Sequence, residues 1–399
     1  MSEDTRWEQL EAAGFNVLNL EPAEIAVDLL SDVPRRAYVP EVQAASLAAV
    51  ERDGAEPDLE ALAARIYGPF QYVFTTRGRA AERALMAGLG LSEFVALAHP
   101  LFRTTQGSLL AAGGRVEPVQ LHSAQAGSTD VDLDWLERRL SAGDVRLVYL
   151  EPGTNAAGGW PLTLENVELA SRLCRQHGAL LLLDCARLLA NCVRLGLPPL
   201  EAAARFTACC DAFTVSCSKE LLAPAGAFAA VRTEALRRRC ETYAFEQGTT
   251  LELYDVRARL AAGLRHLIEH PGLLAERARQ VESLAARLSV LGASVVEPPG
   301  VHAVYLRVPA EHAKTPLQQR ALEALLYRVG GVRSRINPSQ ALGGPLFRFA
   351  VTIGRYPDAA LESAAAGITR FLHQLDEAPH LSLMEGEDAH GMFARYRVA

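Results

Sequence analysis

Short apolar segments alternate with helical patterns between about residues 70 and 232. The apolar segments span residues 72–74, 94–98, 116–121, 147–150, 179–183, 213–215 and 225–231. Runs of this length are typical of buried strands, and the stretches between them, such as 79–89 and 166–176, have the periodicity of helices. The alternation predicts an α/β fold with a mostly parallel seven-stranded sheet, in which ligands bind beyond the carboxyl ends of the strands.

The pattern changes after about residue 251. Two long amphipathic helices are predicted at 255–269 and 273–291, followed by strands at 303–308 and 347–352 and helices at 318–329 and 358–375. This mixture predicts a smaller α+β domain. We therefore expect a large ligand-binding domain of residues 41–262, and a small domain formed by residues 1–40 together with residues 263–399.

Composition and charge limit the partners that the chain can have. It has 399 residues, a formal net charge of -7 and an apolar fraction of 49%. Without basic runs, this balance argues against nucleic acid or an anionic membrane as a partner and favours a small neutral or zwitterionic ligand. The N-terminus MSEDTRWEQLEAAGF is charged, and no apolar stretch approaches the length of a membrane span. We expect a cytoplasmic protein.

The seven cysteines favour free thiols over disulfides or a metal site. They are odd in number, lie mostly in apolar segments, and show no CxxC spacing or neighbouring histidine cluster. No bound metal is therefore predicted.

Lys219 lies in the apolar, small-residue stretch DAFTVSCSKELLAPAGAFAAV, which is predicted to form a strand, a turn and a second strand. Only Lys219 and Lys314 are lysines among the 40 basic side chains. An amine held in such a turn is desolvated, which lowers its pKa and makes it a nucleophile toward an aldehyde. A strand-end lysine that points at solvent is the alternative, so the case for Lys219 depends on other residues.

Three further segments supply those residues. Asp184 ends the apolar run ALLLL, where a buried carboxylate needs a cationic partner. Asn155 lies in EPGTNAAGGWP, whose glycines allow the backbone to approach a ligand. In TTRGRAAE, Arg77, Gly78 and Arg79 open a helix whose exposed amides suit a phosphate. This order describes a site for a pyridine ring that carries an aldehyde and a phosphate, and the predicted cofactor is pyridoxal 5′-phosphate.

The chain also resembles the tryptophanase and tyrosine phenol-lyase family, the β-eliminating lyases of pyridoxal-phosphate fold type I. The matching stretches cover most of the chain and include AGFNVLNLEPAEIAVDLLSD, TTRGRAAERAL, LFRTTQGSLLAAGGRVEPVQL, NAAGGWPLTLENV, LLLDCARLLANC, SCSKELLAP, LLYRVGGVRS, FRFAV and GMFARYRVA. The resemblance implies an aspartate-aminotransferase-like large domain, and it implies at least a homodimer or a homotetramer.

Residue roles follow from the resemblance position by position. It implies Lys219 as the Schiff-base lysine, Asp184 as the partner of the ring nitrogen and Ala186 as packing beneath the ring. Arg187 and Asn155 would contact the ring hydroxyl. The phosphate would be bound by Arg77, Gly78, Arg79 and Ser216, while Phe102 would stack on the ring. Arg348 in FRFAV would bind the substrate carboxylate through its planar guanidinium.

Several positions depart from the family pattern. The loop AAVERDGAEPDLEALAARIYG has no tyrosine to match the family's acid, and Tyr38 is an alternative source of one. Arg103 replaces a family threonine, and Asn337 stands where the phenol-lyase branch selects its leaving group. No acidic ligand for a monovalent cation is recognisable, so potassium is not predicted. The substrate pocket differs from that of the named relatives.

The leading hypothesis is a lyase that acts on an L-amino acid by α-proton abstraction and β-elimination. The alternative keeps the cofactor but changes the outcome, to β-replacement, aldol-type cleavage or transamination in a specialised biosynthetic pathway. A cofactor-binding regulator without turnover is a third interpretation. The absence of a recognisable DNA-binding module argues against that role.

Overall fold

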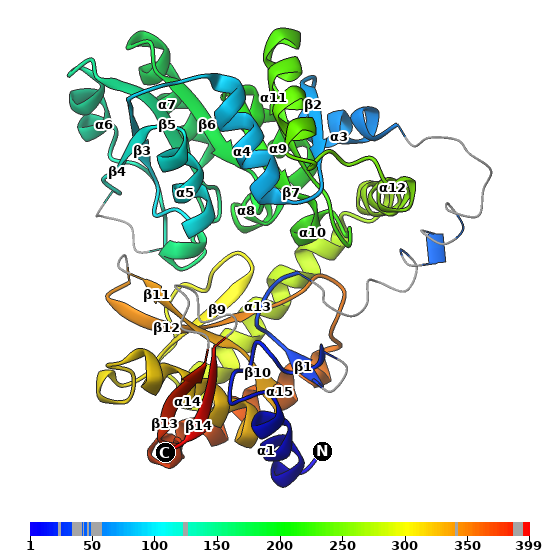
Figure 1. The fold of residues 1–399 in the computed structure, drawn as a ribbon. Helices are drawn as coiled ribbons and strands as arrows, with labels where there is room; N and C mark the ends of the chain where they lie inside the picture. The colour runs from blue at the N-terminus through cyan, green and yellow to red at the C-terminus, as the bar shows by residue number, and fades with distance from the viewer. Residues whose placement is uncertain are drawn as a thin grey trace. The chain divides into compact units, whose positions relative to one another are not determined.

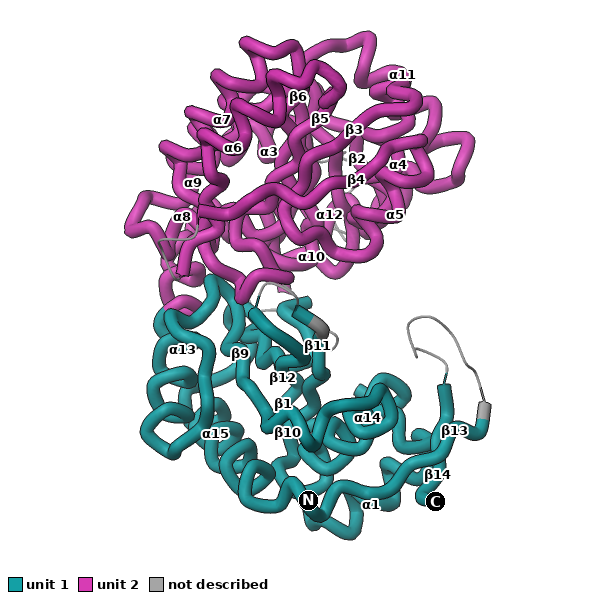
Figure 2. The backbone as a smooth tube through the Cα atoms, turned by 90° about the vertical axis from the view of Figure 1, so that its left-hand side faces the viewer, with its two compact units in different colours: residues 1–36, 279–399 teal, residues 37–278 magenta. Residues whose placement is uncertain are grey.

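The computed structural model describes residues 1–22, 25–33, 42, 44–45, 48, 58–122, 127–339, 342–385 and 394–399. The chain forms two compact units (Figure 2): unit 1 comprises residues 1–36 and 279–399, and unit 2 comprises residues 37–278. Tyr38 lies outside the described residues.

A seven-stranded sheet is the centre of unit 2 (Figure 1), in the order β2-β8-β7-β6-β5-β3-β4. Only β8 is antiparallel to its neighbours among these strands; the other pairs are parallel. The predicted fold class, α/β with a mostly parallel seven-stranded sheet, is confirmed. The strands are β2 (Gln71–Thr75), β3 (Phe94–Ala98), β4 (Gly114–Pro118), β5 (Val145–Leu150), β6 (Leu180–Asp184), β7 (Ala212–Ser216) and β8 (Ala227–Val231).

Helices cover both faces of this sheet. On one face, α4 (Gly78–Leu89), α5 (Arg103–Ala111) and α11 (Glu234–Glu246) pack over small strand residues such as Ala96 and Ala229. On the other face the strands carry Phe213 and Phe228, which contact Tyr67 of α3 (Leu59–Tyr67). Beside α3 lie α9 (Pro199–Ala208) and α12 (Tyr254–Glu269). On α9 pack α7 (Leu164–Gln176) and α8 (Leu188–Arg194), and α6 (Leu133–Leu140) packs on α7. The sheet is therefore buried on both sides, which explains its continuous apolar strands.

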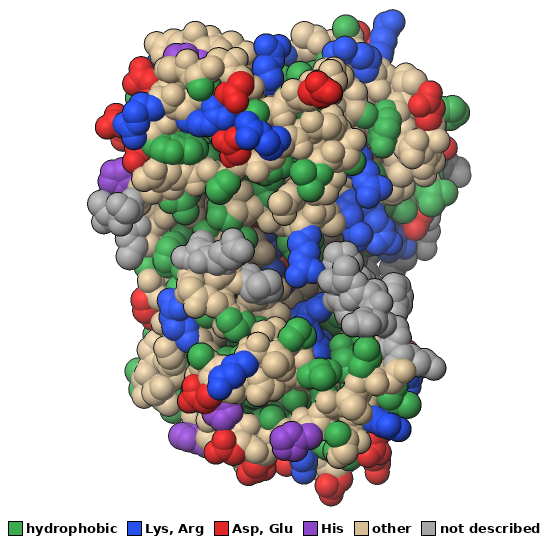
Figure 3. All heavy atoms as spheres, turned by 60° about the vertical axis from the view of Figure 1, so that its left-hand side comes forward, with side chains coloured by type: hydrophobic (Ala, Val, Ile, Leu, Met, Phe, Trp, Pro, Cys, Tyr) green, Lys and Arg blue, Asp and Glu red, His purple; other side chains and the backbone are tan. Residues whose placement is uncertain are grey.

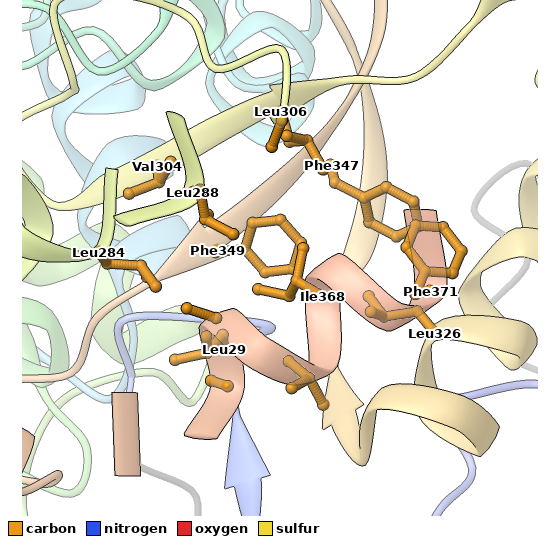
Figure 4. Packing of buried hydrophobic residues seen from close by; sticks show 14 of the residues in the cluster. Leu29, Leu284, Leu288, Val304, Leu306, Leu326, Phe347, Phe349, Ile368 and Phe371 are labelled. Atoms are coloured by element: carbon orange, nitrogen blue, oxygen red, sulfur yellow. The ribbon is translucent and has the colours of Figure 1, made fainter. Parts of the chain in front are cut away.

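Unit 1 is built on the three-stranded antiparallel sheet β11-β12-β9, formed by Arg335–Ser339, Gly344–Ala350 and Ala303–Arg307. One face of the sheet carries Phe347, Phe349 and Leu306, which pack on Leu288 and Ile368 (Figure 4). These last two come from α13 (Gly272–Val290) and α15 (Asp358–Leu372). The helix α14 (Pro316–Leu325) continues into a π-helical turn at Leu326–Gly330. The smaller α+β unit predicted from the sequence therefore has one core on one sheet face.

The chain termini belong to unit 1. The helix α1 (Glu3–Ala12) packs beside the π-helical turn, and β13 (Leu381–Glu385) pairs with β14 (Arg395–Val398). The strand β1 (Val27–Asp28) pairs with β10 (Val332–Arg333), and the buried Arg333 donates to both carboxylate oxygens of Asp28. An ion pair thus fixes the N-terminal segment to the C-terminal part of the chain.

The surface carries charges of both signs. Acidic and basic side chains are interspersed on the face drawn in Figure 3. Within the described residues no helix has the length and apolarity needed to cross a bilayer.

A close packing contact in unit 2 gives a stability prediction. A Cβ added at Gly263 of α12 would overlap the carbonyl oxygen of Leu221 and lie 2.9 Å from that of Leu222. Because backbone on both sides must shift, Gly263→Ala is expected to lower the free energy of unfolding by about 1–3 kcal/mol, measured by thermal denaturation. Gly107→Ala in α5, where a Cβ would meet nothing within 4 Å, is the matched control and should raise the free energy of unfolding by up to about 1 kcal/mol, because alanine favours the helix over glycine. Equal effects of the two substitutions would contradict the prediction.

Candidate active site

All the described strands of the unit 2 sheet except β8 end along one edge of the sheet. Thr75 of β2 and Ser216 of β7 pair with the same residue of β8, Ala227. Asp184, the last residue of β6, pairs with Thr214 of β7. Because β2, β7, β6, β5 and β3 run in the same direction, the segments that follow them form one surface. We call the segments 76–79, 99–103, 151–155, 184–187 and 216–219 the carboxyl rim.

The first part of the carboxyl rim has the features of an anion site. Gly78 begins α4, and a Cβ at this position would lie 3.3 Å from Cβ of Ser216, so only glycine allows this approach without displacing the serine. The residue before it, Arg77, makes no side-chain hydrogen bond to the helix start. The first N–H groups of a 12-residue helix thus lie close to Ser216, with the exposed Arg77 and Arg79 on either side of Gly78. A phosphate group fits this arrangement.

The second part of the carboxyl rim follows β6. Asp184 is 8% exposed, and its Oδ1 accepts a hydrogen bond from the N–H of Ala186 at 2.9 Å. Arg187 is also buried and caps α8. The chain thus turns sharply after the strand. The carboxylate of Asp184 lies two residues before Ala186 in the sequence, and the guanidinium of Arg187 belongs to the residue directly after it.

Lys219 follows β7 on the short helix α10 (Cys217–Glu220) and is half-buried. The next residue, Glu220, is fully enclosed and accepts hydrogen bonds from the N–H groups of Leu189 and Ala190 at 2.9 and 3.2 Å. It also accepts one from Nη2 of the buried Arg277 at 2.5 Å. Burial raises the pKa of Glu220, and Arg277 opposes this shift. Glu220 therefore ties the helix of Lys219 to the helix that Arg187 caps.

The third part follows β5 and contains Asn155. The side chain of Glu151, 4% exposed, accepts the N–H of Asn155 at 3.1 Å, and its Oε1 lies 3.7 Å from Nη1 of Arg187. The backbone N–H of Glu151 donates to Nδ1 of His99 at 3.1 Å. Burial lowers the pKa of His99 to about 4, so this imidazole is neutral at physiological pH. Burial raises the pKa of Glu151 to about 7, assisted by Asp184 and opposed by Arg187 and Lys219.

A further buried carboxyl group, that of Glu82 on α4, interacts with Asp184 and Glu151. Its Oε1 accepts a hydrogen bond from Thr105 at 3.0 Å, whereas Oε2 has no hydrogen-bond partner among the described residues. Burial raises the pKa of Glu82 to about 7, and Asp184 adds to this shift while Lys219 opposes it. Asp184, Glu151 and Glu82 thus repel one another electrostatically, and Lys219 offsets part of the shift at both glutamates. A ligand with a cationic ring nitrogen and a separate phosphate fits this set, because it adds positive charge beside the carboxylates and anionic charge at the start of α4.

Unit 2 brings eleven of the sequence-predicted residues to its carboxyl rim. Phe102 caps α5 and is 54% exposed, and the exposed Arg103 is the first residue of that helix. An apolar ring with half its surface open can cover a flat ligand. The complete set is Arg77, Gly78, Arg79, Phe102, Arg103, Asn155, Asp184, Ala186, Arg187, Ser216 and Lys219.

The two remaining predicted residues, Arg348 and Asn337, belong to unit 1. Arg348 on β12 pairs with Arg335 on β11, and Asn337 pairs with Leu346. Residues two apart share a face, so Arg348 and Asn337 lie together on the face opposite Phe347 and Phe349. Arg348 is half-buried and donates to the carbonyl oxygen of Leu30 at 2.8 Å.

Sequence reasoning missed Glu151, Glu82, His99, Glu220 and Arg277. Glu151 directly follows an apolar strand, as His99 does, and this was the signal that singled out Asp184. Glu82 and Glu220 carried a weaker signal, since each lies close in sequence to a predicted site residue. Arg277 carried none. No group of histidine, cysteine or acidic residues with the arrangement of a metal site occurs in the part of the chain that the structure describes, and all seven cysteines are free.

Comparisons with known proteins identify the family to which the chain belongs. The family model of the beta-eliminating lyases matches residues 28–311. The chain belongs to the beta-eliminating lyase family. A tryptophanase from Hyphomonas neptunium is 28% identical over 388 residues, which covers 90% of this chain and 83% of the relative. A tyrosine phenol-lyase from Intrasporangium calvum is 26% identical over 358 residues, 82% of this chain and 74% of the relative.

Among solved structures, the serine palmitoyltransferase of Sphingomonas wittichii superposes with a TM-score of 0.66 at 17% identity, covering 88% of each chain. This likeness shows the fold, that of the pyridoxal-phosphate fold type I enzymes. Family membership confirms the enzyme class predicted from the sequence, a lyase that depends on pyridoxal 5′-phosphate.

Proposed function

We propose that this beta-eliminating lyase removes the α-proton of an L-amino acid and expels a β-substituent, releasing a keto acid and ammonia. The observation that carries the proposal is the meeting of Lys219, Asp184 and Arg187 at the carboxyl rim. When bound there, the cofactor supplies a ring that accepts the negative charge left at the α-carbon.

The candidate residues of the carboxyl rim have separate roles in this proposal. The amine of Lys219 would hold the cofactor at its aldehyde, and Nζ would be the base that takes the α-proton of the substrate. Asp184 keeps a proton on the ring nitrogen through its charge. Asn155 and Arg187 would contact the ring hydroxyl, and Phe102 and Ala186 would pack on the ring. The start of α4 and Ser216 bind the phosphate.

A second candidate keeps this machinery and changes the outcome to β-replacement, aldol-type cleavage or transamination. The observation that favours it is Arg103, which places an exposed guanidinium next to Phe102 at the start of α5. A charge there suits a polar substrate side chain better than an apolar aromatic one.

Product analysis separates these outcomes. The cofactor-loaded protein would be incubated with a panel of L-amino acids, and the products identified by mass spectrometry. Elimination gives keto acid and ammonia in equal amounts without a second substrate. Transamination requires a keto acid acceptor and releases no ammonia, replacement requires a nucleophile, and aldol cleavage releases glycine and an aldehyde; any of these results would overturn elimination.

We propose Arg348 as the group that binds the substrate carboxylate. Arg348→Lys keeps the charge but loses the planar pair of donors, so KM for the amino acid should rise about 10-fold or more with a smaller change in kcat. Arg307→Lys, on the neighbouring strand β9 of the same sheet, is the matched control. KM and kcat of the two variants would be measured by steady-state kinetics. An unchanged KM for Arg348→Lys would show that Arg348 does not bind the substrate carboxylate.

We also propose that the active form is a homo-oligomer, a dimer or a tetramer, as the family resemblance implies. Light scattering coupled to size-exclusion chromatography measures its mass directly. A monomer with full activity would contradict this proposal.

A further inference from the structure

Glu151 occupies a place in the carboxyl rim that the proposed cofactor contacts leave unexplained. It directly follows β5, and its carboxyl group is 4% exposed. An acidic side chain so enclosed costs folding free energy unless charges or donors compensate it. Its surroundings therefore indicate what it does.

The carboxyl group of Glu151 holds two residues that come from different segments. Its Oε1 accepts the backbone N–H of Asn155 at 3.1 Å and lies 3.7 Å from Nη1 of Arg187. Asn155 and Arg187 are the two residues proposed to contact the ring hydroxyl. One carboxylate thus sets both the course of the loop after β5 and the position of the guanidinium after β6.

Glu151 also sets the balance of charge at this place. Arg187 is buried, so its positive charge is poorly screened by solvent and acts strongly on neighbouring groups. The charged and titratable groups around Glu151 come from five segments: Asp184 on β6, Arg187 at the start of α8, Lys219 on α10, Glu82 on α4, and the neutral His99 after β3. Among them, Arg187 is the cation that lies directly beside the Glu151 carboxyl group.

We propose that Glu151 is a positioning residue that neutralises Arg187 and holds Asn155, and that it thereby sets the protonation of the bond between Lys219 and the cofactor. This inference rests on the proposed roles of Lys219, Arg187 and Asn155. Without the negative charge of Glu151, the positive charge of Arg187 would be uncompensated. It would act on the ring hydroxyl of the cofactor and on the nearby nitrogen that joins Lys219 to the cofactor. A nearby positive charge disfavours a protonated nitrogen, so that nitrogen should lose its proton at lower pH.

The experiment is a pH titration of the visible absorption of the cofactor-loaded protein without substrate, which reports this protonation. In Glu151→Gln the midpoint is expected to fall by about one pH unit or more, the scale of one unit charge acting over several ångströms in a protein site. Glu151→Asp keeps the charge but moves it one methylene away, so it should shift the midpoint in the same direction by less. Glu168→Gln is the matched control, because Glu168 lies in the same unit and forms an exposed pair with Arg205.

The possible outcomes distinguish this inference from the proposed function. Equal midpoints for Glu151→Gln and Glu168→Gln would overturn the inference, as would a rise. Should Glu151→Gln fail to fold, Glu151→Asp decides: a lowered midpoint supports the inference and a wild-type midpoint overturns it. A wild-type protein with a normal visible band and no elimination product would refute the proposed reaction and leave the titration as a valid test. A wild type with no visible band at all would refute the Lys219 assignment and this inference with it.

Discussion

Replacing Lys219 with alanine is expected to abolish the visible absorption of the bound cofactor and to lower kcat by about 10⁴-fold or more. The amine has two proposed tasks, the covalent bond to the cofactor aldehyde and the removal of the α-proton, and a methyl group can perform neither. Cofactor can still bind through the start of α4, Ser216 and Asp184. Equilibrium dialysis should therefore show retained but weaker binding, with the spectrum of the free aldehyde.

The chain offers an unusually clean control for this substitution. Lys314, an exposed residue of unit 1, is the only other lysine in the sequence. Lys314→Ala should leave the spectrum and kcat unchanged. Reduction of the loaded wild type with borohydride, followed by peptide mass spectrometry, should place the label on Lys219 alone. A label on Lys314, or a visible band that persists in Lys219→Ala, would refute the assignment.

The strands of unit 2 were predictable because they are buried on both faces and read as continuous apolar runs. The segment 116–121 shows the limit of this signal, since β4 is Gly114–Pro118. Its first residue, Gly114, has no side chain, so it does not extend the apolar pattern of the sequence. In the structure a Cβ at Gly114 would lie 2.7 Å from the ring of Phe94. Glycine begins this strand because the neighbouring strand packs against its backbone, which only the three-dimensional structure reveals.

The predicted bounds of one helix in unit 1 also differ from those in the structure. The stretch 318–329 was predicted as one helix, but α14 begins at Pro316, where Thr315 and Gln318 form a capping box. That start signal was present in the sequence. The change to a π-helical turn at Leu326 was not readable, because the hydrophobic period continues through it.

The candidate site was predictable where a polar residue lies at or shortly after the end of an apolar strand. Asp184 ends β6, and Asn155 and Lys219 lie within five residues of the ends of β5 and β7. The sequence does not show which charged residues pair across the fold. These pairs are Glu220 with Arg277, 57 residues apart, and Glu151 with Arg187. The partners in each pair lie far apart in the sequence, so only the folded structure shows which charges are balanced.

Asp184→Asn is expected to lower kcat while the turn after β6 keeps its structure. Asparagine can still accept the N–H of Ala186 that Oδ1 of Asp184 accepts, so the turn after β6 should persist. The lost charge no longer favours a proton on the ring nitrogen, and kcat should fall about 10²-fold to 10³-fold while cofactor remains bound. Asp134→Asn, at an exposed position of α6, is the control and should be neutral.

The same substitution should stabilise the cofactor-free protein at alkaline pH. Burial and Asp184 raise the pKa values of Glu82 and Glu151 to about 7. A carboxyl group whose pKa is higher in the folded state binds more protons when folded, so these two groups make stability fall as pH rises from about 4.5 through 7. Removing the charge of Asp184 weakens that repulsion. The melting temperature of Asp184→Asn relative to wild type should therefore be higher at pH 8 than at pH 5, and an equal difference at both pH values would show that Asp184 does not act on these carboxyl groups.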